Sequence, residues 1–325
     1  MKQLATQIIR SVAATALLLG AAVTASAQQN FDNVQIRTQK LTDSVYMLIG
    51  SGGNIGLSVG PDAVFMIDDQ YAPLTPKIEA AIKAITPQPV KFVINTHWHG
   101  DHTGGNVNMG KAGALIIAHD NVRRRLSTDQ FIDFMRARVA PMAKEGLPVV
   151  TFSQDVTFHI NGDEVVVFHV PSAHTDGDGI IRFRKANIFH MGDVFFNGFY
   201  PFIDYSSGGT PDGFIAAVDR VLAMTDDNTR IIPGHGPLAN KADLVAYRNM
   251  LAGTIGNIKK LVAEGKNLDA VVAAKPTAEF DERWGKGFVP PARYIEIVMK
   301  GLGAIPVNPP VAPPPTVAPT NDARK

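Results

Sequence analysis

The segment NTHWHGDHTGG holds the densest chemistry of the chain, because three of the nine histidines and one aspartate fall close together in it. It follows a mostly apolar run that predicts a β-strand. Side chains two apart in a strand point to the same face, so His97 and His99 suit two ligands of one metal ion. Gly100 permits a sharp turn, after which Asp101 and His102 can face a second position.

Three more side chains of metal-binding type follow predicted strands farther along the chain: His174, Asp193 and His235. Each lies in a loop bordered by glycine or proline. Loops that leave the same edge of a sheet can bring such side chains together. The spacing therefore indicates one polar site, assembled from several strand ends.

In this order, the HxHxDH string and the three downstream residues resemble the ligand pattern of the metallo-β-lactamase fold superfamily, over about residues 34–301. The resemblance implies an α+β fold, a four-layer αβ/βα sandwich, with a site for two metal ions. It implies these ligands: His97, His99 and His174 for one ion, Asp101, His102 and His235 for the other, and Asp193 as the bridge.

Other acidic and imidazole side chains are assigned different roles. Family members carry an aspartate at the end of the strand before the first helix, here Asp68, which would support the metal-binding loop from behind the ligands. Alternatively, Asp68 only forms the turn at that strand end. Asp176 and Asp178 are interpreted as turn residues or as supports of the loop. The histidines without a matching motif are expected to be hydrogen-bonded core residues: His119, His159, His169 and His190.

Two Zn²⁺ ions are the expected cofactors, because histidine and carboxylate ligands with an open position suit zinc. A bridging carboxylate also tolerates iron or manganese. In the mechanism that the resemblance implies, a hydroxide held between two ions roughly 3.5–4 Å apart attacks a carbonyl carbon. Asp101 is the expected catalytic residue, which orients this nucleophile or passes its proton on.

The elements around the site follow from hydrophobic patterning. Short apolar segments separated by Gly, Pro and Asp predict strands over about residues 34–67, and spaced isoleucines predict a helix over Pro76–Ile85. Residues 120–146 are predicted to be helical. The second half again has strands and then helices, the first with Thr210 as N-cap and Pro211 at its start. This order favours two sheets packed face to face with helices outside.

Four apolar side chains of the segment 120–146 have two possible roles. They either lie near the mouth of the site or only pack against the domain, and the sequence does not decide between these roles. They are Phe131, Phe134, Met135 and Met142.

The first 27 residues have the pattern of a secretory signal peptide. Lys2 and Arg10 accompany an apolar run, and Ala25-Ser-Ala27 is a small-x-small cleavage site. A membrane anchor is disfavoured, because the run is shorter than the ~20 residues that span a bilayer. We predict cleavage after Ala27, a periplasmic or secreted catalytic domain over residues 28–302, and a disordered or semi-rigid Pro-rich tail over residues 303–325.

Composition excludes some functions. Cleavage would remove two basic residues and no acid, which changes the formal net charge from +1 to −1. A near-neutral chain is a poor candidate for binding nucleic acid. With no cysteine, the chain has no disulfides and any metal must be held by His and carboxylate. The predicted partner is a small-molecule substrate, with no membrane association after cleavage; the sequence does not indicate an oligomeric state.

The substrate is less clearly specified. Export and the segment Tyr200–Gly213, which resembles the substrate-side loop of exported β-lactamase-like members, favour a β-lactam. Against this, Asp193 stands where one lactamase group has cysteine, Phe196 replaces a drug-binding lysine, and the loop Ser51–Ile55 is short and polar. We expect hydrolysis of a cyclic amide or ester, with β-lactam slightly favoured over lactone. The candidate substrate contacts are Phe196, Tyr200 and Ser207.

Alternative functions stay open. A lactonase or a glyoxalase II-like thioesterase would use the same ligands. An iron-dependent oxidoreductase on the same fold belongs to another class of enzyme. A metal-stabilised binding module without catalysis would need a blocked site, whereas the ligand set here is complete.

Overall fold

The computed structural model describes residues 30–307. The chain divides into two compact units, residues 1–33 and 34–325. In the first, the side-chain oxygen of Asn30 accepts a hydrogen bond from the backbone N–H of Asp32 at 2.8 Å. The predicted signal peptide and most of the predicted Pro-rich tail lie outside the described residues.

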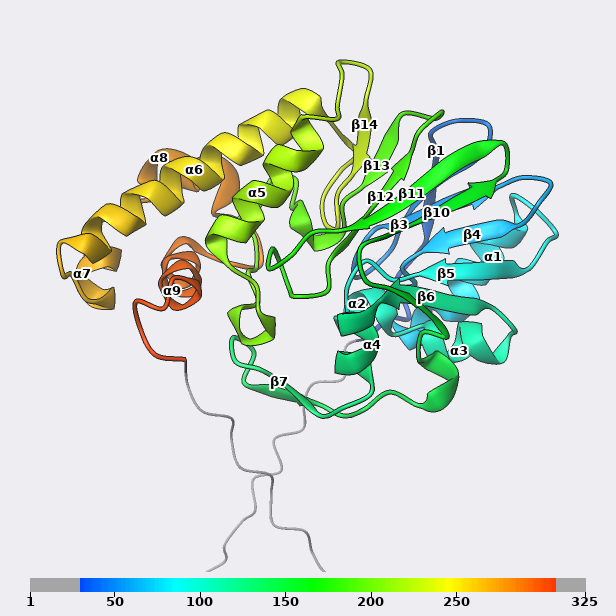
Figure 1. The fold of residues 1–325 in the computed structure, drawn as a ribbon, viewed down its shortest axis with the longest axis horizontal. Coiled ribbons are helices and arrows are strands. Elements are labelled where there is room, and N and C mark those ends of the chain that lie inside the picture. The colour runs from blue at the N-terminus through cyan, green and yellow to red at the C-terminus, as the bar shows by residue number, and fades with distance from the viewer. Residues whose placement is uncertain (1–29, 308–325) are drawn as a thin grey trace, which may run out of the picture. The chain divides into compact units, whose positions relative to one another are not determined.

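The second unit is built on two mixed sheets (Figure 1). In the first sheet, neighbouring strands run antiparallel up to β4 and parallel from β4 onward. Its strands, in spatial order, are β1 (Arg37–Lys40), β2 (Val45–Ile49), β3 (Ile55–Val59), β4 (Val64–Ile67), β5 (Val90–Ile94), β6 (Leu115–His119) and β9 (Val150–Phe152).

The second sheet is antiparallel except where β13 pairs with β14. Its strands, in spatial order, are β10 (Asp155–Ile160), β11 (Asp163–His169), β12 (Gly179–Phe183), β13 (Ile188–His190), β14 (Arg230–Ile232) and β15 (Ala239–Asn240). Strands β1 to β4 lie in the region of about residues 34–67 where strands were predicted, because apolar runs between turn residues mark them clearly.

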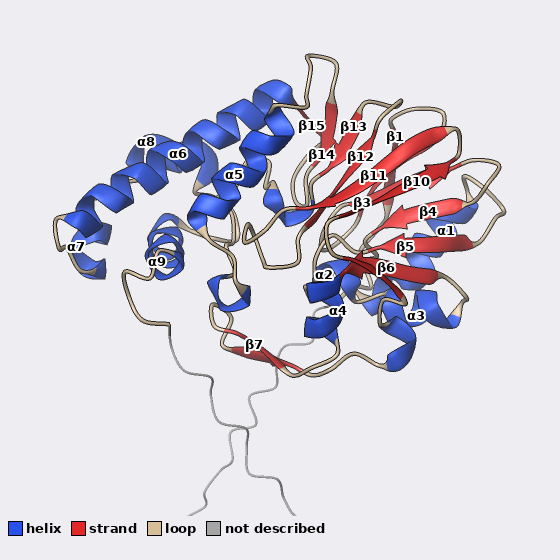
Figure 2. Cartoon of the chain, in the orientation of Figure 1, coloured by secondary structure: helices blue, strands red, loops and turns tan. Residues whose placement is uncertain are grey.

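Two hydrophobic layers hold the sandwich together. Between the sheets, Phe65 and Ile117 of the first sheet share a cluster with Val167 and Ile188 of the second. Behind the second sheet, Phe189 belongs to another cluster that includes side chains of the outer helices. Helices therefore cover the outer faces, and the predicted four-layer αβ/βα sandwich is confirmed (Figure 2).

The helices divide between the two sheets in chain order (Figure 1). On the side of the first sheet are α1 (Thr75–Lys83), α2 (Gly100–Thr103), α3 (Asn106–Lys111) and α4 (Asp120–Leu126). On the side of the second are α5 (Pro211–Leu222), α6 (Lys241–Ala263), α7 (Leu268–Ala273), α8 (Ala278–Trp284) and α9 (Pro291–Gly301). Within residues 30–307 the chain also forms four 3-10 turns: η1 (Ala72–Leu74), η2 (Lys144–Gly146), η3 (Gly192–Val194) and η4 (Tyr205–Ser207).

The predicted start of α5 is confirmed. The Thr210 hydroxyl accepts the backbone N–H of Gly213 at 3.0 Å, and Pro211 occupies the first helical position. Proline loses nothing there, because the first N–H of a helix has no intrahelical partner. Between Asn30 and Val307, no helix combines the length and the apolar character needed to cross a membrane.

The helical prediction for residues 120–146 is wrong beyond Leu126. The Ser127 and Thr128 hydroxyls both donate to the Arg124 carbonyl and compete with continued helix formation. The chain then forms a two-stranded hairpin, β7 (Gln130–Ile132) and β8 (Ala137–Val139). Arg136 adopts the left-handed φ of 53° that closes its turn.

Candidate metal centre

Seven potential metal donors converge in the structure from loops of both sheets. The loop after β5 contributes four of them, and the loops after β11, β13 and β14 contribute one each. The donors form two groups: His97, His99, His174 and Asp193, and then Asp101, His102 and His235. All seven candidate ligands named from the sequence thus lie together.

The first group is compact and buried. The Nδ1 atom of His99 lies 3.1 Å from His97 Nε2 and 2.9 Å from His174 Nε2. The Oδ2 atom of Asp193 lies 3.8 and 3.6 Å from the same two Nε2 atoms. Three imidazole nitrogens and one carboxylate oxygen therefore surround a common point.

The second group is more open. The Oδ2 atom of Asp101 lies 3.6 Å from His102 Nε2 and 3.3 Å from His235 Nε2. The other oxygen of Asp193, Oδ1, lies 3.0 and 3.3 Å from these nitrogens. Asp193 consequently presents one oxygen to each group, which is the geometry a bridging ligand needs.

Two local explanations from the sequence are wrong, although the residues converge. Strand β5 ends at Ile94, so His97 and His99 lie in the loop beyond it and strand periodicity does not align them. Gly100 opens α2, and a Cβ atom placed on it would meet nothing within 4 Å. Neither a strand face nor a glycine turn therefore positions these ligands; buried hydrogen bonds to the backs of the imidazoles do.

Asp68 is the centre of these hydrogen bonds. It is fully buried, and its Oδ2 accepts from His102 Nδ1 at 2.7 Å and from the Thr96 hydroxyl at 2.7 Å. Its Oδ1 accepts the backbone N–H of Thr96. Because the Thr96 hydroxyl donates to Asp68, its oxygen can accept a hydrogen bond from His97 Nδ1, which lies 3.0 Å away. The supporting aspartate proposed from the sequence thus holds His102 directly and His97 through the Thr96 hydroxyl.

Two acceptors from another loop orient the remaining imidazoles of the first group. His174 Nδ1 lies 2.7 Å from the Phe202 carbonyl, which can only accept. His99 Nε2 lies 2.9 Å from Asp204 Oδ2. Each outward nitrogen therefore carries the proton, and each inward nitrogen offers a lone pair.

These proton positions provide a test of whether the residues suit a metal. Three inward lone pairs that face one another at about 3 Å repel unless a cation lies between them. The buried Asp193 Oδ1 also makes no well-aligned hydrogen bond. The donor set is therefore chemically incomplete by itself, and it fits divalent cations bound by imidazole and carboxylate.

Electrostatics distinguish the two groups. Burial lowers the pKa of His174 to about 4, so this imidazole is neutral and ready to bind a metal at neutral pH. Burial also opposes protonation of His235, but Asp193 and Asp101 outweigh it and raise the pKa to about 9. The second group thus favours positive charge at its centre, whether a proton or a metal ion supplies it.

Glycines allow the donors to approach the backbone. A Cβ atom on Gly53 would lie 2.1 Å from the His102 ring, and one on Gly234 would lie 2.1 Å from Asp193 Oδ1. Both glycines belong to loops at the site rather than to the histidine string. Their absent side chains leave the space that the buried ligands occupy.

The three candidate substrate contacts have different surroundings. The Phe196 ring stacks on His235, with centroids 5.3 Å apart and an 11° interplanar angle. Tyr200 is 1% exposed and donates its hydroxyl to Asp281, so it packs within the helical layer. Ser207 is also buried, and its N–H supports Asp204. Phe196 is the one of the three with a ring contact to the donors.

Sequence patterns missed two residues at the centre. Asp204 directly follows the buried pair Phe202–Ile203. An acidic residue directly after two apolar residues is the sequence signal that could have pointed to it. Tyr71 follows Asp68 by three positions, and its ring edge and the Asp101 side chain both lie within 3.3 Å of the space above Gly52. Burial, Asp101 and Asp193 raise the pKa of the Tyr71 phenol to about 12, so it stays protonated.

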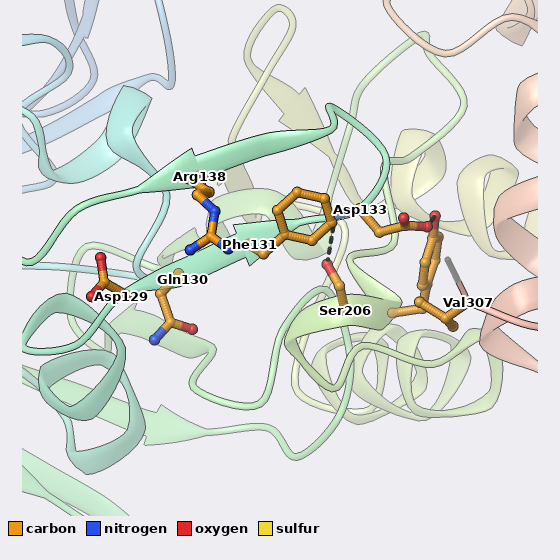
Figure 3. Close-up of a pocket in the computed structure, with 8 residues that line it drawn as sticks. Asp129, Gln130, Phe131, Asp133, Arg138, Ser206 and Val307 are labelled. Atoms are coloured by element: carbon orange, nitrogen blue, oxygen red, sulfur yellow. Dashed lines mark hydrogen bonds between the residues drawn. The ribbon is translucent and has the colours of Figure 1, made fainter. Parts of the chain in front are cut away.

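A separate pocket of about 570 Å³ lies along the β7–β8 hairpin (Figure 3). Phe131 and Arg138 of the hairpin and Ser206 of η4 line it, whereas none of the seven donors does. Ser206 accepts the backbone N–H of Asp133 at 3.2 Å and donates its own hydroxyl to Asp204 at 2.5 Å. The hairpin is therefore linked through Ser206 to the acid behind His99.

Comparison with known proteins agrees with this geometry. The family model described as the metallo-beta-lactamase superfamily matches residues 49–235. A hydroxyacylglutathione hydrolase of Nitrosococcus oceani is 30% identical over 46% of this chain and 49% of its own length. A beta-lactamase-like protein 2 homolog of Caenorhabditis elegans is 23% identical over 62% of this chain and 65% of its own length. The chain thus spans less than two thirds of either relative.

A solved structure has the same fold. A metallo-beta-lactamase from Pontibacter korlensis aligns with a TM-score of 0.55 and 19% identity, over 67% of this chain and 99% of that one. At this identity the likeness concerns the fold alone.

Proposed function

Because this chain belongs to the metallo-β-lactamase superfamily, we propose that it is a hydrolase that depends on two metal ions. The observation that carries the proposal is the bridging position of Asp193, with one oxygen toward each donor group. The inward lone pairs of the first group support it, since they need a cation between them. The proposed ligands of the two ions are those named from the sequence, with Asp68 as the support behind them.

Bound divalent ions would supply an activated water and would polarise a carbonyl group of the substrate. The residues of the chain contribute the rest. The Asp101 side chain is 23% exposed, which makes it more accessible than Asp193 at 6%. Burial opposes its ionisation, but His102 and His235 outweigh it and lower the Asp101 pKa to about 2. Asp101 is therefore an ionised carboxylate at the mouth, able to orient a water molecule and accept its proton.

We propose zinc as the metal and a cyclic amide or ester as the substrate, with β-lactam slightly ahead of lactone. Histidine and carboxylate donors with an accessible side favour zinc, and iron or manganese stay compatible with a bridging carboxylate. Phe196 covers His235 with an apolar ring and offers no charge for a substrate carboxylate.

A thioester hydrolase is the second candidate. The observation in its favour is the 30% identity to a hydroxyacylglutathione hydrolase. An iron-dependent oxidoreductase on the same fold would differ from both hydrolases, because it would contain iron and consume oxygen.

The test is a substrate panel with the purified, zinc-loaded protein: β-lactams, acyl lactones and a glutathione thioester, with metal analysis of the protein as isolated. Turnover of lactones without turnover of β-lactams would reverse the order of the two leading substrates. If the purified protein contains iron and consumes oxygen, the oxidoreductase would replace the hydrolase as the proposed function.

The Asp101→Asn variant tests the role of this carboxylate. It should fold and retain the ion of the first donor group but lose turnover by about 10²-fold or more, because the amide is a weaker ligand of the second ion and cannot accept the proton. Turnover equal to that of the unaltered protein would refute the proposed role.

We also propose that the chain is exported and cleaved after Ala27, with the catalytic domain over residues 28–302. The support is the basic, apolar and small-x-small order of the first 27 residues. N-terminal sequencing of the protein from the periplasm or medium should begin at Gln28. An intact N-terminus on protein recovered from the cytoplasm would overturn this.

A further inference from the structure

Three phenylalanines lead from the metal centre to the surface. The Phe202 ring stacks on His99, with centroids 5.7 Å apart and an interplanar angle of 23°, and lies equally far from His174. Phe134 packs on Phe202 at 5.0 Å, and Phe288 packs on Phe134 at 5.6 Å. We call these three side chains the aromatic row. Its exposure increases outward, from 4% at Phe202 to 66% at Phe288.

The row is held in place at the hairpin. Arg293 lies over the Phe134 ring at 4.7 Å and donates to the Phe134 carbonyl. The preceding residue, Asp133, is buried and bonds Lys300 of α9 at 2.8 Å. The hairpin turn is therefore fixed to α9, and the middle ring of the row is preorganised rather than free to collapse.

The outer end of the row is also held close to the metal-site loops. A Cβ atom on Gly287 would lie 2.5 Å from the ring of Phe199, which follows η3. The loop between α8 and α9 thus packs against the segment that begins with Asp193. This packing joins the loop that carries Phe288 to the segment after Asp193.

The cations nearest the middle of the row form ion pairs within the chain. Arg293 pairs with Glu296, and Lys300 pairs with both Glu296 and Asp133. Arg136, at the hairpin turn, also pairs with Asp133. Each of these cations contacts a carboxylate of the chain, and the three rings themselves carry no charge, so the row itself suits an uncharged group.

We propose that the aromatic row binds an uncharged hydrocarbon group of the substrate, an acyl chain or an aryl ring, while the scissile carbonyl lies at the metal centre. The inference rests on the proposed hydrolase function and deepens it by naming the substrate class. Because the Phe288 ring is exposed, covering it with an apolar group of the substrate would be favourable. Each methylene that becomes fully buried raises the affinity about fourfold. Because the ring contacts are continuous from His99 to Phe288, the hydrocarbon group would lie along Phe134.

The experiment uses two homologous series on the zinc-loaded protein: N-butanoyl to N-decanoyl homoserine lactones, and the same acyl groups on aminopenicillanic acid. We expect kcat/KM to rise about fourfold for each added pair of methylenes in the series that is hydrolysed, since an open row buries about half of each group. The rise should level off once the chain passes Phe288.

The Phe288→Ser variant should fold, because the ring is largely exposed. It should lower kcat/KM for the decanoyl compound about tenfold and leave the butanoyl compound unchanged, whereas Phe288→Leu should restore most of the loss. The matched control is Val149→Ser, which removes an apolar side chain that is 64% exposed and outside the row. This control should follow the unaltered protein at every chain length.

The outcomes separate the inference from the function. If kcat/KM does not depend on acyl chain length, or if Phe288→Ser does not alter it, the inference is overturned. The hydrolase proposal is unaffected by either outcome. If neither series is hydrolysed, the proposed cyclic amide and ester substrates are wrong. Calorimetric binding of the same compounds then decides the inference, which falls if decanoyl and butanoyl compounds bind equally. A dimer that Phe288→Ser dissociates would also overturn it, because a second copy would then cover the row.

Discussion

At the scale of single residues, the space around the ligands matters as much as the ligands themselves. His102 is buried and held by Asp68 at Nδ1, so its ring cannot move away from a new atom at Gly53. Gly100 lies within the histidine string, yet the space beside it is open. The two glycines therefore differ in what a methyl group would meet.

We predict that Gly53→Ala lowers metal occupancy at the second donor group and turnover by about tenfold or more, because its methyl group would overlap the His102 ring. Metal analysis and steady-state kinetics measure both effects. Gly100→Ala is the control and should retain both properties. Equal behaviour of the two variants would contradict the proposed crowding at His102.

Asp204 offers a second test at this scale. Burial raises its pKa, but the contact with His99 outweighs that, and the pKa falls to about 2. An ionised acid behind His99 strengthens the inward lone pair.

The Asp204→Asn variant keeps the size of the side chain and removes the charge. We predict that it weakens binding of the first ion by about 10- to 100-fold. Competition with a chelator measures this affinity, and Asp212→Asn, at an exposed acid on α5, is the control. Unaltered affinity in Asp204→Asn would show that charge behind His99 is not needed.

At the scale of elements, the β7–β8 hairpin depends on contacts outside itself. A two-stranded hairpin is marginally stable alone. Here Asp133 accepts from Lys300, from the Tyr205 hydroxyl at 2.7 Å and from Arg136 at 2.7 Å. These contacts join the hairpin to α9 and η4, and they explain why a segment that resembles a helix in sequence forms two strands.

We predict that Lys300→Met destabilises the protein by about 1–3 kcal/mol and exposes the hairpin to proteolysis. The reason is that a buried carboxylate loses its ammonium partner while keeping two others. Denaturant unfolding and limited proteolysis measure these effects. Lys40→Met, which removes an exposed pair with Asp43, should leave both unchanged. An unaltered hairpin in Lys300→Met would show that the pair is dispensable.

At the scale of the whole molecule, two histidines join the sheets. His119 ends β6 of the first sheet and His169 ends β11 of the second, and their rings stack with centroids 3.8 Å apart. Burial lowers the pKa of both, and the neighbouring His119 lowers that of His169 further. Neither lies in the metal centre, as the sequence indicated.

These shifts predict how stability depends on pH. Because the folded pKa values lie below the unfolded value of 6.5, the unfolded chain binds more protons below that pH. The free energy of unfolding should therefore fall as pH drops below 6.5. His169→Gln should make this decrease shallower, and His159→Gln should not. The prediction that His159 is a core residue is wrong, because its side chain is exposed on β10. Chemical unfolding at a series of pH values measures the slopes, and parallel slopes for all three proteins would refute the interpretation.

Much of the architecture followed from local patterns. Apolar runs bounded by turn residues predicted most strands, and the cap at Thr210 predicted the start of α5. The hairpin and helices α7 and α8 did not follow. Their short segments are stabilised by packing against distant elements, and sequence periodicity does not record such contacts.

The sequence by itself determined which side chains could bind metal, because few residue types do so and their order along the chain is distinctive. Only the tertiary structure decided where their protons lie. His99 turns the lone pair of Nδ1 inward because Asp204, far along the chain, accepts a hydrogen bond from its Nε2–H. His174 does so because of the Phe202 carbonyl, and His102 because of Asp68. The hydrogen-bond acceptor at the outward nitrogen fixes which nitrogen keeps its lone pair, and only the folded chain brings that acceptor next to the imidazole.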